Sequence, residues 1–122
     1  MILKRIEDFK SFRSVDGCEI VEVIGLKTTE TKEVSVAYAT IKPKQETYPH
    51  KHGFTEVYVI LQGKGIIYMN SKNKPIRRGD NILIPKGTWH HVKNTGKTNL
   101  KIMCICTPAF TEKKTKLKNR NF

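Results

Sequence analysis

The sequence lacks a long hydrophobic run. No stretch reaches the roughly 18 consecutive apolar residues that a membrane-spanning helix needs, and hydrophobic residues make up only 38% of the 122-residue chain. The N-terminus, MILKRIED, carries charges where a secretion signal would have an apolar core. We therefore expect a soluble, cytoplasmic protein with no membrane partner.

Cysteine is scarce as well. The chain has three cysteines, an odd number, and no CxxC pair, so a disulfide framework is not expected. Cys104 and Cys106 alternate within the apolar run from Leu100 to Cys106. Free cysteine behaves as a small hydrophobic residue, and we expect both side chains to be buried.

Acidic residues are few. Eleven Asp and Glu face 23 Lys and Arg, which gives a formal net charge of +12. The basic residues are scattered along the chain, and no recognition helix, zinc finger or RNP-type aromatic stretch accompanies them. A lysine-rich solvated surface is the simplest interpretation, and no specific nucleic-acid partner is expected. Weak nonspecific binding to nucleic acid at low salt stays open.

Long helical periodicity is also missing. Short apolar or alternating runs, separated by Gly, Pro, Asn and Asp turn signals, predict an all-β sandwich or barrel. The length suits a single domain. Residues 1–14 could form a short helical turn or a leading edge strand, and Gln62–Gly65 is predicted to be a hairpin turn. The expected strands cover residues 19–26, 34–41, 50–61, 66–70, 82–84, 89–92 and 100–106.

The stretch from Pro49 to Glu56 carries the most chemistry. His50, His52 and Glu56 lie at even offsets, so on one extended strand they share a face with Phe54, Tyr58 and Ile60. This places two imidazoles and a carboxylate in an apolar interior. A buried carboxylate is costly unless it is paired, and a divalent metal ion is the simplest partner.

Two spaced motifs resemble those of the cupin superfamily. The first is His50-x-His52-x3-Glu56-x6-Gly63, and the second is Gly79-x5-Pro85-x-Gly87-x2-His90-x3-Asn94. The usual leading glycine of the first motif is replaced by Lys44. The resemblance covers roughly residues 34–107 and implies a single-domain cupin barrel of jelly-roll type. Residues 1–33 would form an N-terminal arm with strands, and residues 108–122, including Arg120, a basic tail, either frayed or forming an outer helix.

The resemblance also implies a site. It makes His50, His52, Glu56 and His90 the ligands of one divalent transition metal ion, and this donor set suits Fe, Mn, Ni, Co, Cu or Zn without discriminating among them. His91 has the opposite parity to His90 and should face away. Catalytic residues stay unassigned. Residues expected near the barrel mouth as pocket candidates are Tyr38, Tyr48, Phe54, Tyr58 and Met69.

Function is less constrained than fold. The resemblance implies a metal-dependent enzyme that acts on a small polar metabolite, either a sugar-phosphate isomerase-like protein or a dioxygenase-like protein. The alternative is a noncatalytic cupin that binds a small ligand through its metal. A homodimer is expected from the resemblance, with the apolar segment Glu19–Leu26 as a candidate edge for pairing.

Overall fold

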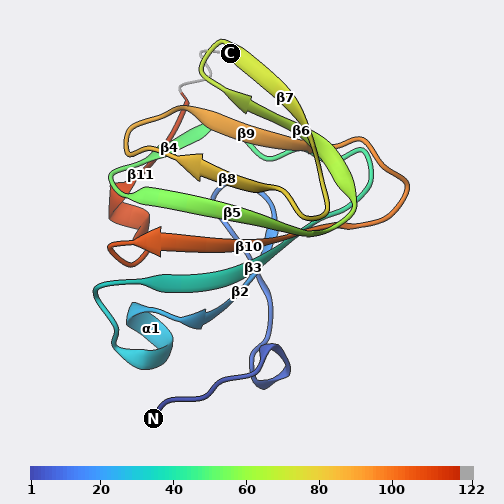
Figure 1. Cartoon of the computed structure of the whole chain (residues 1–122). Coiled ribbons are helices and arrows are strands. Elements are labelled where there is room, and N and C mark those ends of the chain that lie inside the picture. The colour runs from blue at the N-terminus through green and yellow to red at the C-terminus, as the bar shows by residue number, and fades with distance from the viewer. Residues whose placement is uncertain (119–122) are drawn as a thin grey trace.

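Two antiparallel β-sheets make up the computed structural model, which describes residues 1–118 (Figure 1). The six-stranded sheet runs, in spatial order, β1 (Phe12–Arg13), β2 (Glu19–Ile24), β3 (Ser35–Ile41), β10 (Leu100–Thr107), β5 (Thr55–Gln62) and β8 (Asn81–Ile84). The five-stranded sheet runs β11 (Thr115–Leu117), β4 (His50–His52), β9 (His90–Asn94), β6 (Lys64–Met69) and β7 (Lys72–Arg77). Short helical turns are η1 (Ile6–Asp8), α1 (Leu26–Thr29) and η2 (Glu112–Lys114). The predicted all-β, jelly-roll architecture is confirmed.

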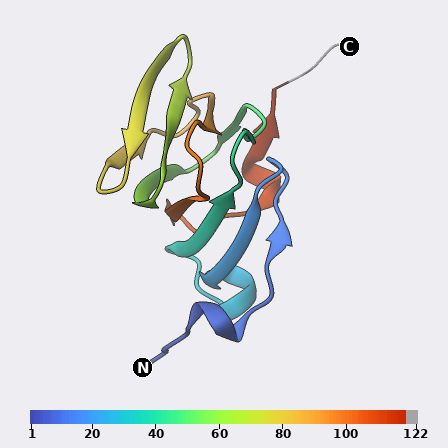
Figure 2. The same cartoon turned by 90° about the vertical axis from the view of Figure 1, so that its right-hand side faces the viewer.

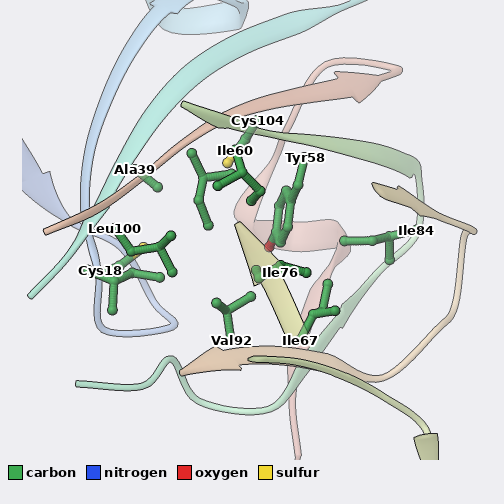
Figure 3. Close-up of a cluster of buried hydrophobic side chains, with 12 residues drawn as sticks. Cys18, Ala39, Tyr58, Ile60, Ile67, Ile76, Ile84, Val92, Leu100 and Cys104 are labelled. Carbon is green, nitrogen blue, oxygen red and sulfur yellow. The ribbon is translucent and has the colours of Figure 1, made fainter. Parts of the chain in front are cut away.

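The core lies between the inner faces of the two sheets (Figure 3). Along β5 and β10 every second residue is buried, which is the period expected of strands with one face on a core. Cys18, Cys104 and Cys106 are buried free thiols, as predicted for the last two. The core cluster consists of Cys18, Ala39, Ile41, Tyr58, Ile60, Ile67, Ile76, Ile84, Val92, Leu100, Ile102 and Cys104.

The chain changes sheets at Gly63, so the predicted hairpin turn there is wrong. β5 belongs to the six-stranded sheet, whereas β6 pairs with β7 and β9 in the other. Gly63 has a φ of +85°, and a Cβ at this position would lie 2.8 Å from the carbonyl oxygen of Asn99. Both the backbone conformation and the close approach therefore require glycine at the crossing.

A true hairpin joins β6 to β7, and sequence analysis missed its second strand. The turn between the strands is Asn70–Ser71. β7 lies at the edge of its sheet and contains Pro75, a residue that edge strands tolerate because it cannot donate to a neighbour. In Figure 2 this hairpin, in yellow and green, stands on the opposite side of the molecule from β1 and β2, in blue.

A short strand near each end of the described chain joins one of the sheets. Residues 1–14 contain both a helical turn, η1, and a strand, β1. Because β1 pairs with β2, the segment Glu19–Leu26, predicted as an edge for dimer pairing, lies second in its sheet. Near the C-terminus, β11 pairs with β4 where a frayed tail or an outer helix was predicted. Arg120, counted in that tail, lies outside the described residues. Within residues 1–118, no helix is long and apolar enough to cross a membrane.

Candidate metal centre

Four buried side chains converge between the two sheets. One ligand atom from each of His50, His52, Glu56 and His90 lies within 4.8 Å of the others. His50 on β4 pairs directly with His90 on β9, and β5 in the facing sheet supplies Glu56. The predicted single strand over residues 50–61 is thus two strands, interrupted at Gly53–Phe54. The interruption lets the two walls of the fold contribute ligands from opposite sides.

The Nδ1 atoms of all three histidines are anchored away from the centre. His50 Nδ1 lies 2.7 Å from the carbonyl oxygen of Tyr48, and His90 Nδ1 lies 2.8 Å from that of Thr88. A carbonyl oxygen only accepts hydrogen bonds, so Nδ1 carries the proton in both rings. When these imidazoles are neutral, each Nε2 then presents a bare lone pair to the centre, which is the form that binds a metal.

The convergence of acceptors fits a bound cation. The Nε2 atoms of His52 and His90 each lie 3.3 Å from Oε1 of Glu56. Glu56 Oε1 and His90 Nε2 have no hydrogen-bond partner among the described residues, which is costly for buried polar atoms. The other carboxylate oxygen, Oε2, accepts a 3.4 Å hydrogen bond from the Cys106 thiol. Oε1 is therefore the oxygen left to bind a metal ion.

Burial and neighbouring groups determine the protonation of two of the four side chains, His50 and Glu56. Burial and the neighbouring His90 together lower the pKa of His50 to about 4, against the raising effect of Asp16. Burial alone would raise the pKa of Glu56, but His52 and His90 outweigh it and hold that pKa well below its ordinary value of 4.5. At neutral pH the centre therefore has a neutral His50 and an ionised Glu56.

A cavity of about 60 Å³ opens beside these ligands. Among the described residues, its wall includes no lysine or arginine, although the chain has a net charge of +12. Asp16 and Glu22 are the carboxylates on the wall besides Glu56, and Asp16 Oδ2 lies 3.6 Å from His50 Nε2. Most of the remaining wall is apolar, with residues such as Ala39, Ile41, Tyr58, Val92, Ile102 and Phe110.

The five predicted pocket residues are dispersed. Tyr58 lies on the cavity wall, and Phe54 stacks on the His52 ring with centroids 4.4 Å apart. Tyr38 points to the outer face of β3, because Ala37, Ala39 and Ile41 occupy the inner positions. The other two residues line separate pockets. Tyr48 lines a pocket of about 180 Å³, and Met69 lines a pocket of about 430 Å³.

Sequence analysis missed two polar residues at the centre. Asp16 received no role from the sequence, yet it is 8% exposed and accepts hydrogen bonds from the amide and thiol of Cys18. Thr115, in the predicted tail, lies 2.8 Å from His52 Nδ1. No local sequence signal marks either residue, because only the folded chain brings them to the motif. The prediction that His91 faces away is confirmed, since its ring stacks on Tyr68.

Comparisons with known proteins agree with this geometry. A family model described as "Cupin domain" matches residues 37–106. An uncharacterized protein of Methanocaldococcus jannaschii is 29% identical, over 96% of this chain and 94% of that protein. A Thermotoga maritima protein named oxalate-binding protein is 31% identical, over 71% of this chain and 73% of its own length. A crystal structure from the same species, titled "a predicted oxalate decarboxylase", superposes with a TM-score of 0.77 at 25% identity, covering 88% of this chain and 99% of that one.

Proposed function

Because this chain belongs to the cupin family, we propose that it holds one divalent transition metal ion and binds a small carboxylic acid at that ion. The metal ligands in this proposal are His50, His52, Glu56 and His90. Four protein ligands leave one or two positions open on a five- or six-coordinate ion. The observation that carries the proposal is the small, largely apolar cavity whose wall includes three of these four side chains, His50, His52 and Glu56.

The size of the cavity supports a small ligand. A volume of about 60 Å³ has room for roughly four to six water-sized groups, at about 10–15 Å³ for each. An acid of two to four carbons suits this space, whereas a sugar phosphate is much larger.

The absence of basic side chains from the wall argues against a phosphorylated ligand. A phosphate group is usually bound by arginine or lysine side chains, and no such side chain lines the cavity within residues 1–118. A sugar-phosphate isomerase would need one, so we favour a dioxygenase-like enzyme or a noncatalytic binding protein. A carboxylate can instead bind to the metal itself, whose charge the single carboxylate ligand Glu56 only partly neutralises.

We further propose that the protein is an enzyme of the dioxygenase-like kind. A bound metal of this ligand set supplies a Lewis acid for the substrate oxygens and, as iron or manganese, a redox centre. The chain itself anchors the imidazoles and surrounds the substrate with apolar side chains that exclude water. Asp16 and Glu22 place two further carboxylates on the wall beside the proposed substrate.

A second candidate function is noncatalytic binding of such an acid. It is supported by the name of the Thermotoga maritima relative, an oxalate-binding protein. The enzyme and the binding protein share the metal and the acid and differ only in turnover.

Separate measurements decide between turnover and binding. Protein loaded anaerobically with Fe(II) or Mn(II) is titrated with oxalate, glyoxylate, pyruvate and malonate by calorimetry, and oxygen uptake and acid consumption are then followed. Metal-dependent binding with turnover supports the enzyme, and metal-dependent binding without turnover supports the binding protein. If none of the acids binds to the loaded protein, the proposed ligand class is wrong.

We also propose a homodimer that forms through the outer face of the six-stranded sheet. Apolar side chains alternate with the buried ones there and continue from strand to strand, as the register shows for Tyr38, Met103 and Val59. Such a continuous face on a soluble protein is typical of an interface, and a second copy offers a matching one. This outer apolar face consists of Val21, Val36, Tyr38, Val57, Val59, Leu83, Met103 and Ile105.

A cytoplasmic location is proposed on the state of the cysteines. All three are buried and free, which suits a reducing compartment.

A further inference from the structure

The three histidines of the metal centre are anchored in two different ways. Backbone carbonyl oxygens hold the Nδ1 atoms of His50 and His90. A side chain, the hydroxyl of Thr115, holds Nδ1 of His52 at 2.8 Å. A backbone carbonyl acceptor is present with any amino acid at that position. The acceptor for His52, in contrast, depends on the side chain at position 115.

The hydrogen bonding of Thr115 determines the direction of this contact. Its Oγ1 lies 3.1 Å from the carbonyl oxygen of Thr111, which can only accept, so the single hydroxyl proton is donated there. Oγ1 therefore faces His52 with its lone pairs and accepts the Nδ1 proton. This leaves Nε2 of His52 bare and aimed at Glu56 Oε1, 3.3 Å away.

The position of Thr115 is held by its own strand. β11 pairs antiparallel with β4 so that Thr115 lies opposite His52. The amide of Gly53 donates to the carbonyl oxygen of Lys114 at 2.7 Å, and the amide of Lys118 donates to that of Pro49 at 2.9 Å. Hydrogen bonds on both sides thus fix the register that brings the hydroxyl to the imidazole.

We propose that Thr115 is a positioning residue of the metal centre, and that β11 controls metal affinity through it. The hydroxyl selects the Nδ1–H tautomer of His52 and orients its ring. Without an acceptor at this point, the proton can move to Nε2, where Glu56 Oε1 would accept it and the lone pair for the metal would be lost. This inference rests on the proposed metal site.

Metal affinity provides the first test. Thr115→Val keeps the shape but removes the acceptor, and Thr115→Ser keeps the hydroxyl. Thr111→Val is a matched control, because the Thr111 hydroxyl is buried without a hydrogen-bond partner in the described part of the chain. In chelator competition with Co(II) or Zn(II), Thr115→Val should bind about 10–100-fold more weakly than wild type. The metal affinities of Thr115→Ser and Thr111→Val should stay within about threefold of wild type. Affinity is then lost only when the hydroxyl acceptor at position 115 is removed.

Equal affinity of wild type and Thr115→Val would overturn the proposal, as would an equal loss in Thr111→Val. If Thr115→Val does not fold, Thr115→Ala carries the same comparison, because alanine also lacks the hydroxyl and does not introduce the two methyl groups of valine. Circular dichroism spectra and unfolding midpoints of the metal-free variants show whether the fold is kept.

The tautomer can be read without any metal. In metal-free protein labelled with 15N-histidine, His52 should show the Nδ1–H tautomer in wild type and in Thr115→Ser, and a shift toward Nε2–H in Thr115→Val. An unchanged His52 tautomer in Thr115→Val would contradict the proposal even if the metal affinity fell. Failure of the wild type to bind metal would instead refute the proposed function, while the tautomer measurement would still test Thr115.

Discussion

At the scale of a single residue, Asp16 contributes one of the carboxylates on the cavity wall. Its carboxylate lies 3.6 Å from the His50 imidazole, beside the space proposed for the acid. A fixed negative charge there disfavours a dianion more than a monoanion. With metal-loaded protein, Asp16→Asn should bind oxalate of order tenfold more tightly and pyruvate with a smaller gain.

Calorimetric titration of both acids into wild type and variant measures the effect of Asp16. Weaker binding of oxalate in Asp16→Asn would contradict this role for the charge. Metal content measured alongside separates a ligand effect from loss of the metal.

A second prediction at the residue scale concerns the reactivity of the three buried thiols. Burial raises the pKa of Cys18 and of Cys104 well above the ordinary value of 9.0, and burial together with Glu56 does the same for Cys106. The thiolate is the reactive form, so raising the pKa lowers reactivity at any pH below it. Native protein should therefore react slowly with a disulfide reagent from pH 7 to 9, and unfolded protein should react at all three cysteines. Rapid reaction of a native thiol at pH 8 would contradict this.

At the scale of the elements, the site depends on the points where the chain crosses from one sheet to the other. Gly63 lies at the crossing from β5 to β6, and Gly79 at the crossing from β7 to β8. Gly63 and Gly79 both have positive φ, but only at Gly63 does an added Cβ meet a neighbour, the backbone of Asn99 and Leu100. Backbone strain should cost about 1 kcal/mol in Gly79→Ala. Gly63→Ala should cost about 1–3 kcal/mol more, because the adjacent backbone must also shift.

Urea unfolding of both glycine variants measures the difference. Equal destabilisation would show that the close approach at Gly63 contributes nothing beyond the backbone conformation.

Local patterns predicted most strands but not the paths between them. Period-two burial along Thr55–Gln62 and Leu100–Thr107 was visible in the sequence, as was the spacing of the motifs. Gly53 and Gly63 were interpreted as interior and hairpin positions, because nothing local distinguishes a hairpin from a crossing to the other sheet. β11 went unpredicted because a short polar strand is stable only through its pairing with β4.

The outer faces of the two sheets differ at the scale of the whole molecule, and this supports a dimer. The outer apolar face lies on the six-stranded sheet, with Met103 between Tyr38 and Val59. Met103→Lys should shift the protein from dimer to monomer, because an unpaired charge at the centre of an interface is strongly unfavourable. Ile66→Lys, on the outer face of the other sheet beside Lys93, is the matched control and should stay dimeric.

Light scattering after size exclusion gives the mass of each species. A monomeric wild type, or a dimer that Ile66→Lys breaks and Met103→Lys does not, would contradict the proposed face.

The central claim is that four side chains from opposite sheets bind one metal ion. The most direct test is elemental analysis of protein purified without chelator, compared with a His50→Ala, His90→Ala double variant. Wild type should carry about one equivalent of a transition metal, or take it up on loading, and the variant almost none. A wild type that stays metal-free after loading, or a double variant that retains a full equivalent, would contradict the assignment of His50, His52, Glu56 and His90.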